Sequence, residues 1–182
     1  MDEIVKAALK KWPTVPHCYG WLALDARGQW FMRDDRIQRA GPFPQVKGSV
    51  IRHEKLLEFI HRNYEHDDAG CWFFQNGPQR VYVQLEAAPL VWRVRFADGA
   101  AQVSAHTGQA AQVKGAWLDE HGRLFLDTDL GFGVVHSQDV LDASGAIETG
   151  AWPLQSLPFA DMPGRFGYVL APEPGPAPAG SH

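Results

Sequence analysis

The residues that could hold a metal ion form the pattern Glu-x-x-x-Glu-x-x-His, at Glu54, Glu58 and His61. This spacing would put the three side chains on one face of a helix. Carboxylate metal sites in helical proteins need a second helix of the same kind, and the second helix that the sequence predicts here supplies only Asp139. We therefore interpret the three residues as a solvated charged face and predict no metal site.

Nucleophilic chemistry has one candidate pair, His17 and Cys18, which are neighbours in the chain. Adjacent residues on a strand point to opposite faces, so this imidazole could not easily activate this thiol. The other cysteine, Cys71, belongs to no Cys-x-x-Cys pair either, and we expect both to be reduced thiols in or near the core. The chain also lacks the Gly-x-Ser-x-Gly elbow and the Gly-x-x-x-x-Gly-Lys-[Ser/Thr] phosphate loop. These observations assign no catalytic residue and no cofactor, and they lean away from an enzyme.

Anion binding has better candidates. Arg52 and His53 stand at the start of a predicted helix, where free N–H groups and the helix dipole favour negative charge, and Arg80 supplies a further guanidinium. Trp30 and Tyr82 could form an aromatic wall beside them. The competing interpretation is that the aromatic rings fill the core and that Arg80 makes a surface ion pair.

Composition limits the function classes. The chain has 182 residues, with 17 Lys and Arg against 21 Asp and Glu, so its net charge of −4 indicates no nucleic-acid polymer as partner. No apolar run approaches the roughly 18 residues that span a bilayer, and the acidic start is followed by no signal-peptide core. We therefore expect no membrane partner and a cytoplasmic location. The 18 Gly, 13 Pro and 7 Trp argue against a helical bundle and favour short strands joined by tight turns.

Hydrophobic periodicity predicts a chain of alternating strands and turns with few helices. Helices are expected over residues 2–11, 52–64 and 137–141, hairpins over 20–33 and 116–127, and a loop over 34–47. Single strands are expected over 71–75, 80–86, 91–96, 101–105, 132–136 and 165–170.

Four Asp-x-x-Gly turns, at Asp25, Asp67, Asp119 and Asp142, mark an internal duplication. In each half a Trp-Leu pair precedes an Asp-x-x-Gly hairpin, a strand then leads into a helix, and a second Asp-x-x-Gly follows. The predicted fold is therefore α+β, with two related small units, each a curved antiparallel β-sheet packed with one helix, plus a short N-terminal helix. We divide the chain into a helix and connector over 1–16, a first unit over 17–97, a second unit over 98–170 and a disordered tail over 171–182. The boundary between the two units is expected within residues 98–114.

Two segments resemble a bacterial family of domains of unknown function. Residues 18–31, CYGWLALDARGQWF, are similar to the opening hairpin of that family, and residues 80–89, RVYVQLEAAP, are similar to its second signature strand. The resemblance implies a duplicated domain whose second half is superficially like a pleckstrin-homology fold. It also implies a nucleotide-type ligand at the interface and a role in signalling.

The sequence therefore predicts a non-catalytic ligand-binding or signalling module. Its ligand would be an anionic small molecule, or a nucleotide, held between the two units by Arg52, His53, Arg80, Tyr82 and Trp30. Two alternatives stay open. One is a protein–protein interaction scaffold without a small ligand, and the other is a metal-assisted enzyme that uses Glu54, Glu58 and His61.

Overall fold

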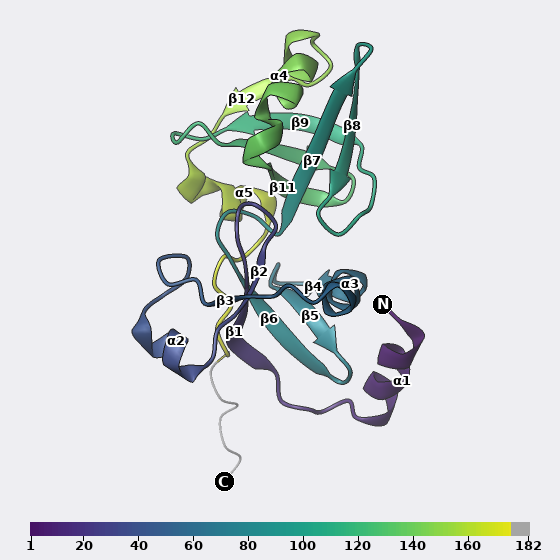
Figure 1. Ribbon diagram of the computed structural model, residues 1–182, viewed down its shortest axis with the longest axis vertical. Helices are drawn as coiled ribbons and strands as arrows, with labels where there is room; N and C mark the ends of the chain where they lie inside the picture. Colours follow the sequence, from purple (N-terminus) through teal and green to yellow (C-terminus); the bar gives the residue numbers. More distant parts are fainter. Residues whose placement is uncertain (176–182) are drawn as a thin grey trace.

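A computed structural model describes residues 1–175 of the chain and contains two six-stranded sheets, one above the other in Figure 1. The predicted α+β fold with two related units is confirmed, and both sheets are mixed because each includes parallel as well as antiparallel pairs. The pleckstrin-homology likeness of the second half stays a prediction. Within residues 1–175 no helix combines the length and the apolar character needed to cross a membrane.

The first sheet has the strand order β3-β2-β1-β6-β5-β4. Its strands are β1 (Cys18–Leu24), β2 (Trp30–Met32), β3 (Ser49–Val50), β4 (Tyr64–His66), β5 (Trp72–Asn76) and β6 (Gln79–Leu85). The consecutive residues Leu22, Ala23 and Leu24 are all buried, which requires cover on both faces of the sheet. The helix α3 (Glu54–Arg62) packs on one face, where the rings of Phe59 and Phe74 meet edge to face at 5.5 Å.

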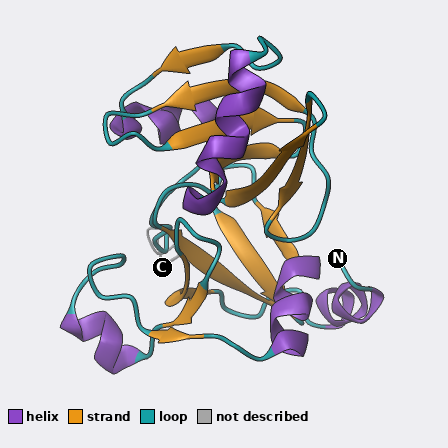
Figure 2. Ribbon diagram, turned by 45° about the horizontal axis from the view of Figure 1, so that its top comes forward, coloured by secondary structure: helices purple, strands orange, loops and turns teal. Residues whose placement is uncertain are grey.

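The second sheet has the order β12-β9-β10-β11-β7-β8. Its strands are β7 (Leu90–Ala97), β8 (Ala100–Ala105), β9 (Val113–Leu118), β10 (Leu124–Thr128), β11 (Gly131–Val135) and β12 (Leu154–Ser156). The helix α4 (Val140–Glu148) crosses this sheet in Figure 2, and its Gly145 lies so close to the Phe96 ring that a Cβ there would be 2.5 Å from a ring carbon. Short helical turns at Ser137–Asp139 and Phe159–Asp161 and the helix α5 (Met162–Phe166) complete the unit.

The two units share one strand arrangement. In the first, β1, β2 and β3 form an antiparallel meander, a helix follows, and β6 returns parallel to β1. In the second, β9, β10 and β11 form the meander, α4 follows, and β12 returns parallel to β9. Each unit adds a pair of strands at one edge only: β5 and β4 lie beyond the return strand, whereas β7 and β8 lie beyond the third meander strand.

Three of the four Asp-x-x-Gly turns have the same hydrogen bonds. At Asp25, Asp67 and Asp119 one carboxylate oxygen accepts from the backbone N–H groups two and four residues later, and the glycine has a positive φ of 77–84°. The prediction of a fourth turn at Asp142 is wrong, because residues 142–145 lie inside α4. The Asp142 carboxylate instead accepts from the backbone N–H of Phe96.

Other differences from the sequence prediction arise at the ends of elements. Residues 34–47 were expected to be a loop, yet they contain the helix α2 (Asp35–Ala40), whose first turn is capped by the Asp34 carboxylate. Residues 165–170 were expected to be a strand, yet α5 ends there at Gly167 in the left-handed conformation. Residues 98 and 99 form the tight turn of the β7–β8 hairpin, with positive φ at both positions. The chain therefore passes from the first sheet to the second at residues 86–89, before the predicted boundary in residues 98–114. Residues 176–182 of the predicted tail lie outside the described part.

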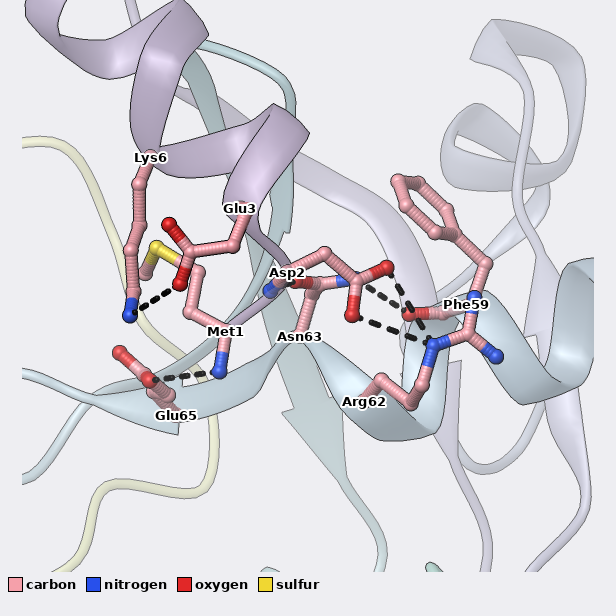
Figure 3. Close-up of polar contacts among 8 residues, drawn as sticks. All are labelled: Met1, Asp2, Glu3, Lys6, Phe59, Arg62, Asn63 and Glu65. Carbon is pink, nitrogen blue, oxygen red and sulfur yellow. Dashed lines mark hydrogen bonds and ion pairs between the residues drawn. The ribbon is translucent and has the colours of Figure 1, made fainter.

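The N-terminal helix α1 (Glu3–Lys11) is attached to the first unit by polar contacts at its start, shown in Figure 3. The backbone N–H of Asp2 donates to the Asn63 side chain at 2.8 Å, and the Arg62 guanidinium donates to the Asp2 carboxylate at 3.2 Å. Asn63 is fully buried, and its amide also donates to the Phe59 carbonyl at 2.9 Å. The helix therefore docks at the end of α3, and of its apolar residues Val5 is buried whereas Ile4 is exposed.

Candidate functional site

The two units meet at a seam, formed by the β1–β2 turn and the end of α3 on one side and by β7 and His106 on the other. A Cβ on Gly28 would lie 3.2 Å from the Cβ of His106, so the turn packs directly on the second unit. The link at residues 86–89 is held from both units, because the hydroxyl of Tyr64 donates to the Pro89 carbonyl and that of Tyr168 to the Ala87 carbonyl.

A cavity of about 240 Å³, here called the Arg52 cavity, lies in the first unit beside this seam. It is lined by Gly28, Gln29, Trp30, Val50, Ile51, Arg52, Leu57 and His61. The Arg52 side chain is exposed, and no carboxylate of residues 1–175 forms an ion pair with it. The site therefore combines a free cation with walls that are mainly apolar and aromatic.

Behind this cavity, Trp30, His61, Tyr64 and His106 pack ring against ring, with centroids 5.1–6.1 Å apart. The indole N–H of Trp30 donates to Nε2 of His61 at 2.9 Å, which places the proton of His61 on Nδ1. The backbone N–H of Val91 donates to Nδ1 of His106 at 3.1 Å, so the proton of His106 is on Nε2. That nitrogen is the one buried side-chain polar atom without a partner in the part of the chain that the structure describes. Burial lowers the pKa of both imidazoles.

His106 should make the stability of the protein depend on pH. Removal from water, reinforced by His61, lowers its pKa to about 3, whereas the unfolded chain keeps a value near 6.5. As the pH falls through 6.5 the unfolded chain takes up a proton that the folded protein does not, so stability falls with pH until about 3. His106 should thus contribute a loss of about 2 kcal/mol in the free energy of unfolding between pH 7 and pH 5.

The substitution His106→Asn tests this, because it keeps an acceptor for the Val91 N–H and removes the titration. Urea unfolding at pH 7 and pH 5 should show a loss smaller by about 2 kcal/mol in the variant. The exposed His121 gives the matched control, His121→Asn, which should behave as the wild type. Equal losses in His106→Asn and the wild type would contradict the prediction.

The structure does not bring together the five residues that the sequence predicts to bind the ligand. Trp30 and Arg52 line the Arg52 cavity, with Trp30 only 1% exposed. His53 lies next to Arg52, and its Nδ1 accepts from the Leu56 N–H as the cap of α3. Arg80 and Tyr82 line none of the cavities described here.

Arg80 and Tyr82 instead form a cluster of their own on the first sheet. The Arg80 guanidinium lies 4.3 Å from the Phe73 ring centroid and donates to the Tyr82 hydroxyl at 3.2 Å. That hydroxyl donates to Asp67 at 3.1 Å, and the Tyr82 ring stacks on Tyr19 at 4.7 Å. Ligand binding by these two residues stays a prediction, and the Arg52 cavity does not involve them.

The sequence pattern Glu54, Glu58 and His61 does not form a cluster in the structure. The two glutamates are exposed, whereas His61 turns inward to Trp30. Within residues 1–175 no group of three or more His, Cys, Asp or Glu side chains is arranged to hold a metal ion. Cys18 and Cys71 are free and half-buried, and burial raises the pKa of both thiols. The role of His61 in the cavity wall had no signal in the sequence, because it depends on the partner Trp30 31 residues away.

Three larger cavities lie elsewhere, and the smallest of them, about 270 Å³, is at the β7–β8 hairpin. One of about 490 Å³ borders the seam, between Phe43, Glu86, Arg123 and Phe159. Its Arg123 is paired with Asp119, and its Glu86 is paired with Lys47. The largest, about 920 Å³, belongs to the second unit and is lined by β7, β8 and Trp152, with Arg93 paired to Asp139 at 2.6 Å. Arg95 also lines this largest cavity without an ion pair among the described residues, but the Arg52 cavity has its unpaired cation beside the start of a helix.

Comparisons with known proteins give one family match and two partial structural similarities. No curated protein matches the chain. Two crystal structures of DUF1285 family proteins are similar in part. The one from Shewanella baltica OS155 is 18% identical, with a TM-score of 0.47, over 68% of this chain and 90% of that chain. The one from Silicibacter pomeroyi DSS-3 is 11% identical, with a TM-score of 0.47, over 78% of this chain and 82% of that chain. The model of the DUF2944 family, described as "Protein of unknown function (DUF2946)", matches residues 1–173. The expected membership of a family of domains of unknown function is confirmed, and the chain belongs to the DUF2944 family.

Proposed function

We propose that this protein is a non-catalytic module that binds an anionic small molecule at the seam, in the Arg52 cavity. The observation that carries the proposal is the unpaired guanidinium of Arg52 on the wall of a concave, largely apolar site beside the seam. Ligand sites are typically concave and apolar with a few polar groups that fix the ligand.

The position of Arg52 adds to its charge. The helix α3 begins at Glu54, two residues later, and the positive end of its dipole favours an anion at this place. The residues that line the cavity all belong to the first unit, but one of them, Gly28, lies in the β1–β2 turn that packs on His106 of the second unit. A ligand bound there would therefore also bias how the units pack, which is what a signalling role requires.

Thermal-shift and calorimetric titration with nucleoside monophosphates and phosphorylated metabolites test the proposal. A ligand should raise the melting temperature of the wild type, and Arg52→Gln should weaken binding about tenfold or more, because a hydrogen-bonded charge pair contributes about 1.5–3 kcal/mol. The matched control is Arg36→Gln on α2, which changes an exposed arginine away from the cavity and should leave affinity unchanged. If no anion stabilises the wild type, or if Arg52→Gln binds as tightly as the wild type, the proposal is wrong.

A further inference from the structure

A second cavity lies next to the Arg52 cavity, and His61 is the one residue that lines both. This second space, here called the Trp72 cavity, has a volume of about 160 Å³. Its other lining residues are Tyr64, Trp72, Leu90, Thr107, Gln109 and Leu130. The two cavities therefore meet at a single imidazole ring.

The volumes of the two cavities indicate that they belong together. Sites for small organic ligands usually have volumes of roughly 300–1,000 Å³. Neither cavity, at about 240 and 160 Å³, reaches that range alone, but the two combined do. Removal of the His61 side chain from between them would also add its own volume.

The two ends of this combined space differ in chemistry. One end has the Arg52 guanidinium, which suits an acid group. The other end has the rings of Tyr64 and Trp72, whose centroids are 4.8 Å apart, with the polar side chains of Thr107 and Gln109 beside them. Aromatic walls with a few hydrogen-bonding groups suit a planar ring.

His61 has few polar contacts for a residue between two cavities, although its ring also packs on those of Trp30 and His106. Its imidazole is half-buried, and its one hydrogen bond among the described residues is the one that it accepts from Trp30. A single neutral hydrogen bond contributes little net stability, so a ligand can offset its loss. Once the imidazole has moved, the Trp30 indole N–H would be free to donate to the ligand.

We propose that the Arg52 and Trp72 cavities are two halves of one binding site, divided in the unliganded protein by His61, and that the ligand is an anion carried on a planar aromatic ring. The acid group binds at Arg52, the ring lies beside Trp72 and Tyr64, and His61 swings aside. This inference rests on the proposed function and adds to it the ligand class and the residue that controls access.

Titration calorimetry with two probes, inorganic phosphate and 1-naphthyl phosphate, tests the inference. The wild type should bind 1-naphthyl phosphate at least tenfold more tightly than phosphate. His61→Ala should bind 1-naphthyl phosphate several-fold more tightly than the wild type, with phosphate affinity unchanged. Trp72→Leu should lose affinity for 1-naphthyl phosphate alone, and Trp21→Leu, at an exposed tryptophan outside both cavities, is its matched control.

A direct readout keeps the test independent of variant stability. In the NMR spectrum of the wild type, the imidazole signals of His61 should shift on addition of 1-naphthyl phosphate and stay in place with phosphate. Equal affinities for the two probes, with no effect of His61→Ala or Trp72→Leu, would overturn this inference and leave the proposed function standing. Absence of binding by both probes would overturn this inference, whereas the proposed function would be judged by its own ligand screen.

Discussion

Replacing Arg33 with leucine should lower the free energy of unfolding by about 3 kcal/mol or more. Arg33 is 2% exposed, and it has no carboxylate partner among the described residues. Its guanidinium donates instead to the carbonyls of Gly41 and Val46, at 2.6 and 3.1 Å, and to the Gln84 side chain at 2.9 Å. A leucine would leave these partly buried acceptors without their donor, and each lost partner costs up to about 1–3 kcal/mol.

Urea unfolding of Arg33→Leu, Arg33→Lys and an Arg36→Leu control measures this effect. Lysine should recover only part of the loss, because its ammonium cannot match the planar guanidinium that bonds three groups at once. Arg36 is exposed on α2, and its replacement should change stability by about 0.5 kcal/mol at most. A fully stable Arg33→Leu protein would show that residues 41–46 are held against the first sheet by other contacts.

Alanine at Gly70 should destabilise the protein by about 3 kcal/mol or more, whereas alanine at Gly122 should cost only about 1 kcal/mol. Both glycines end an Asp-x-x-Gly turn with the same hydrogen bonds, and their φ angles, 84° and 77°, are nearly the same. The backbone strain of an alanine is therefore equal at the two sites. The difference is the surroundings: a Cβ on Gly122 meets nothing within 4 Å, but one on Gly70 would collide with the Gly167 carbonyl oxygen.

Thermal or urea unfolding of the two single variants and the double variant checks this prediction. The sites are distant and share no partner, so the two losses should add. The extra loss at Gly70 measures how firmly residues 167–169 are held, since the Val169 N–H donates to the Gly70 carbonyl at 3.1 Å. If the two alanine substitutions lower the free energy of unfolding equally, the prediction is wrong, and the backbone near Gly167 can move away from the new Cβ without loss of stability.

Much of the fold could be predicted because its signals are local. An Asp at the first position of a turn accepts hydrogen bonds from its own next residues, and a Gly at the fourth accepts a positive φ, so Asp25, Asp67 and Asp119 were identified correctly. The same motif at Asp142 failed because a non-local contact decided it. The Asp142 carboxylate is used by the Phe96 N–H, and Gly145 is needed where the Phe96 ring crosses α4.

The candidate site was predictable only in part for the same reason. Arg52 and Trp30 could be selected from a helix start and an aromatic strand, and they line one cavity. The sequence could not show that Arg80 would lie over Phe73 or that Tyr82 would pair with Asp67, because these contacts depend on strand register. Nor could it show that His61 turns away from Glu54 and Glu58 toward Trp30. A residue between the apolar and the charged face of a helix can point its side chain to either one, and helical spacing does not decide between them.

The backbone at residues 168–170 limits how completely the first unit can form before the second unit has been synthesised. Leu170 accepts from the Leu85 N–H and Val169 donates to the Gly70 carbonyl, so the first unit forms two backbone hydrogen bonds with a stretch more than eighty residues further along. During synthesis the N-terminal half leaves the ribosome first and would ordinarily fold first. Here the hydrogen bonds that join Gly70 and Leu85 to residues 169 and 170 form only after the second unit has been made.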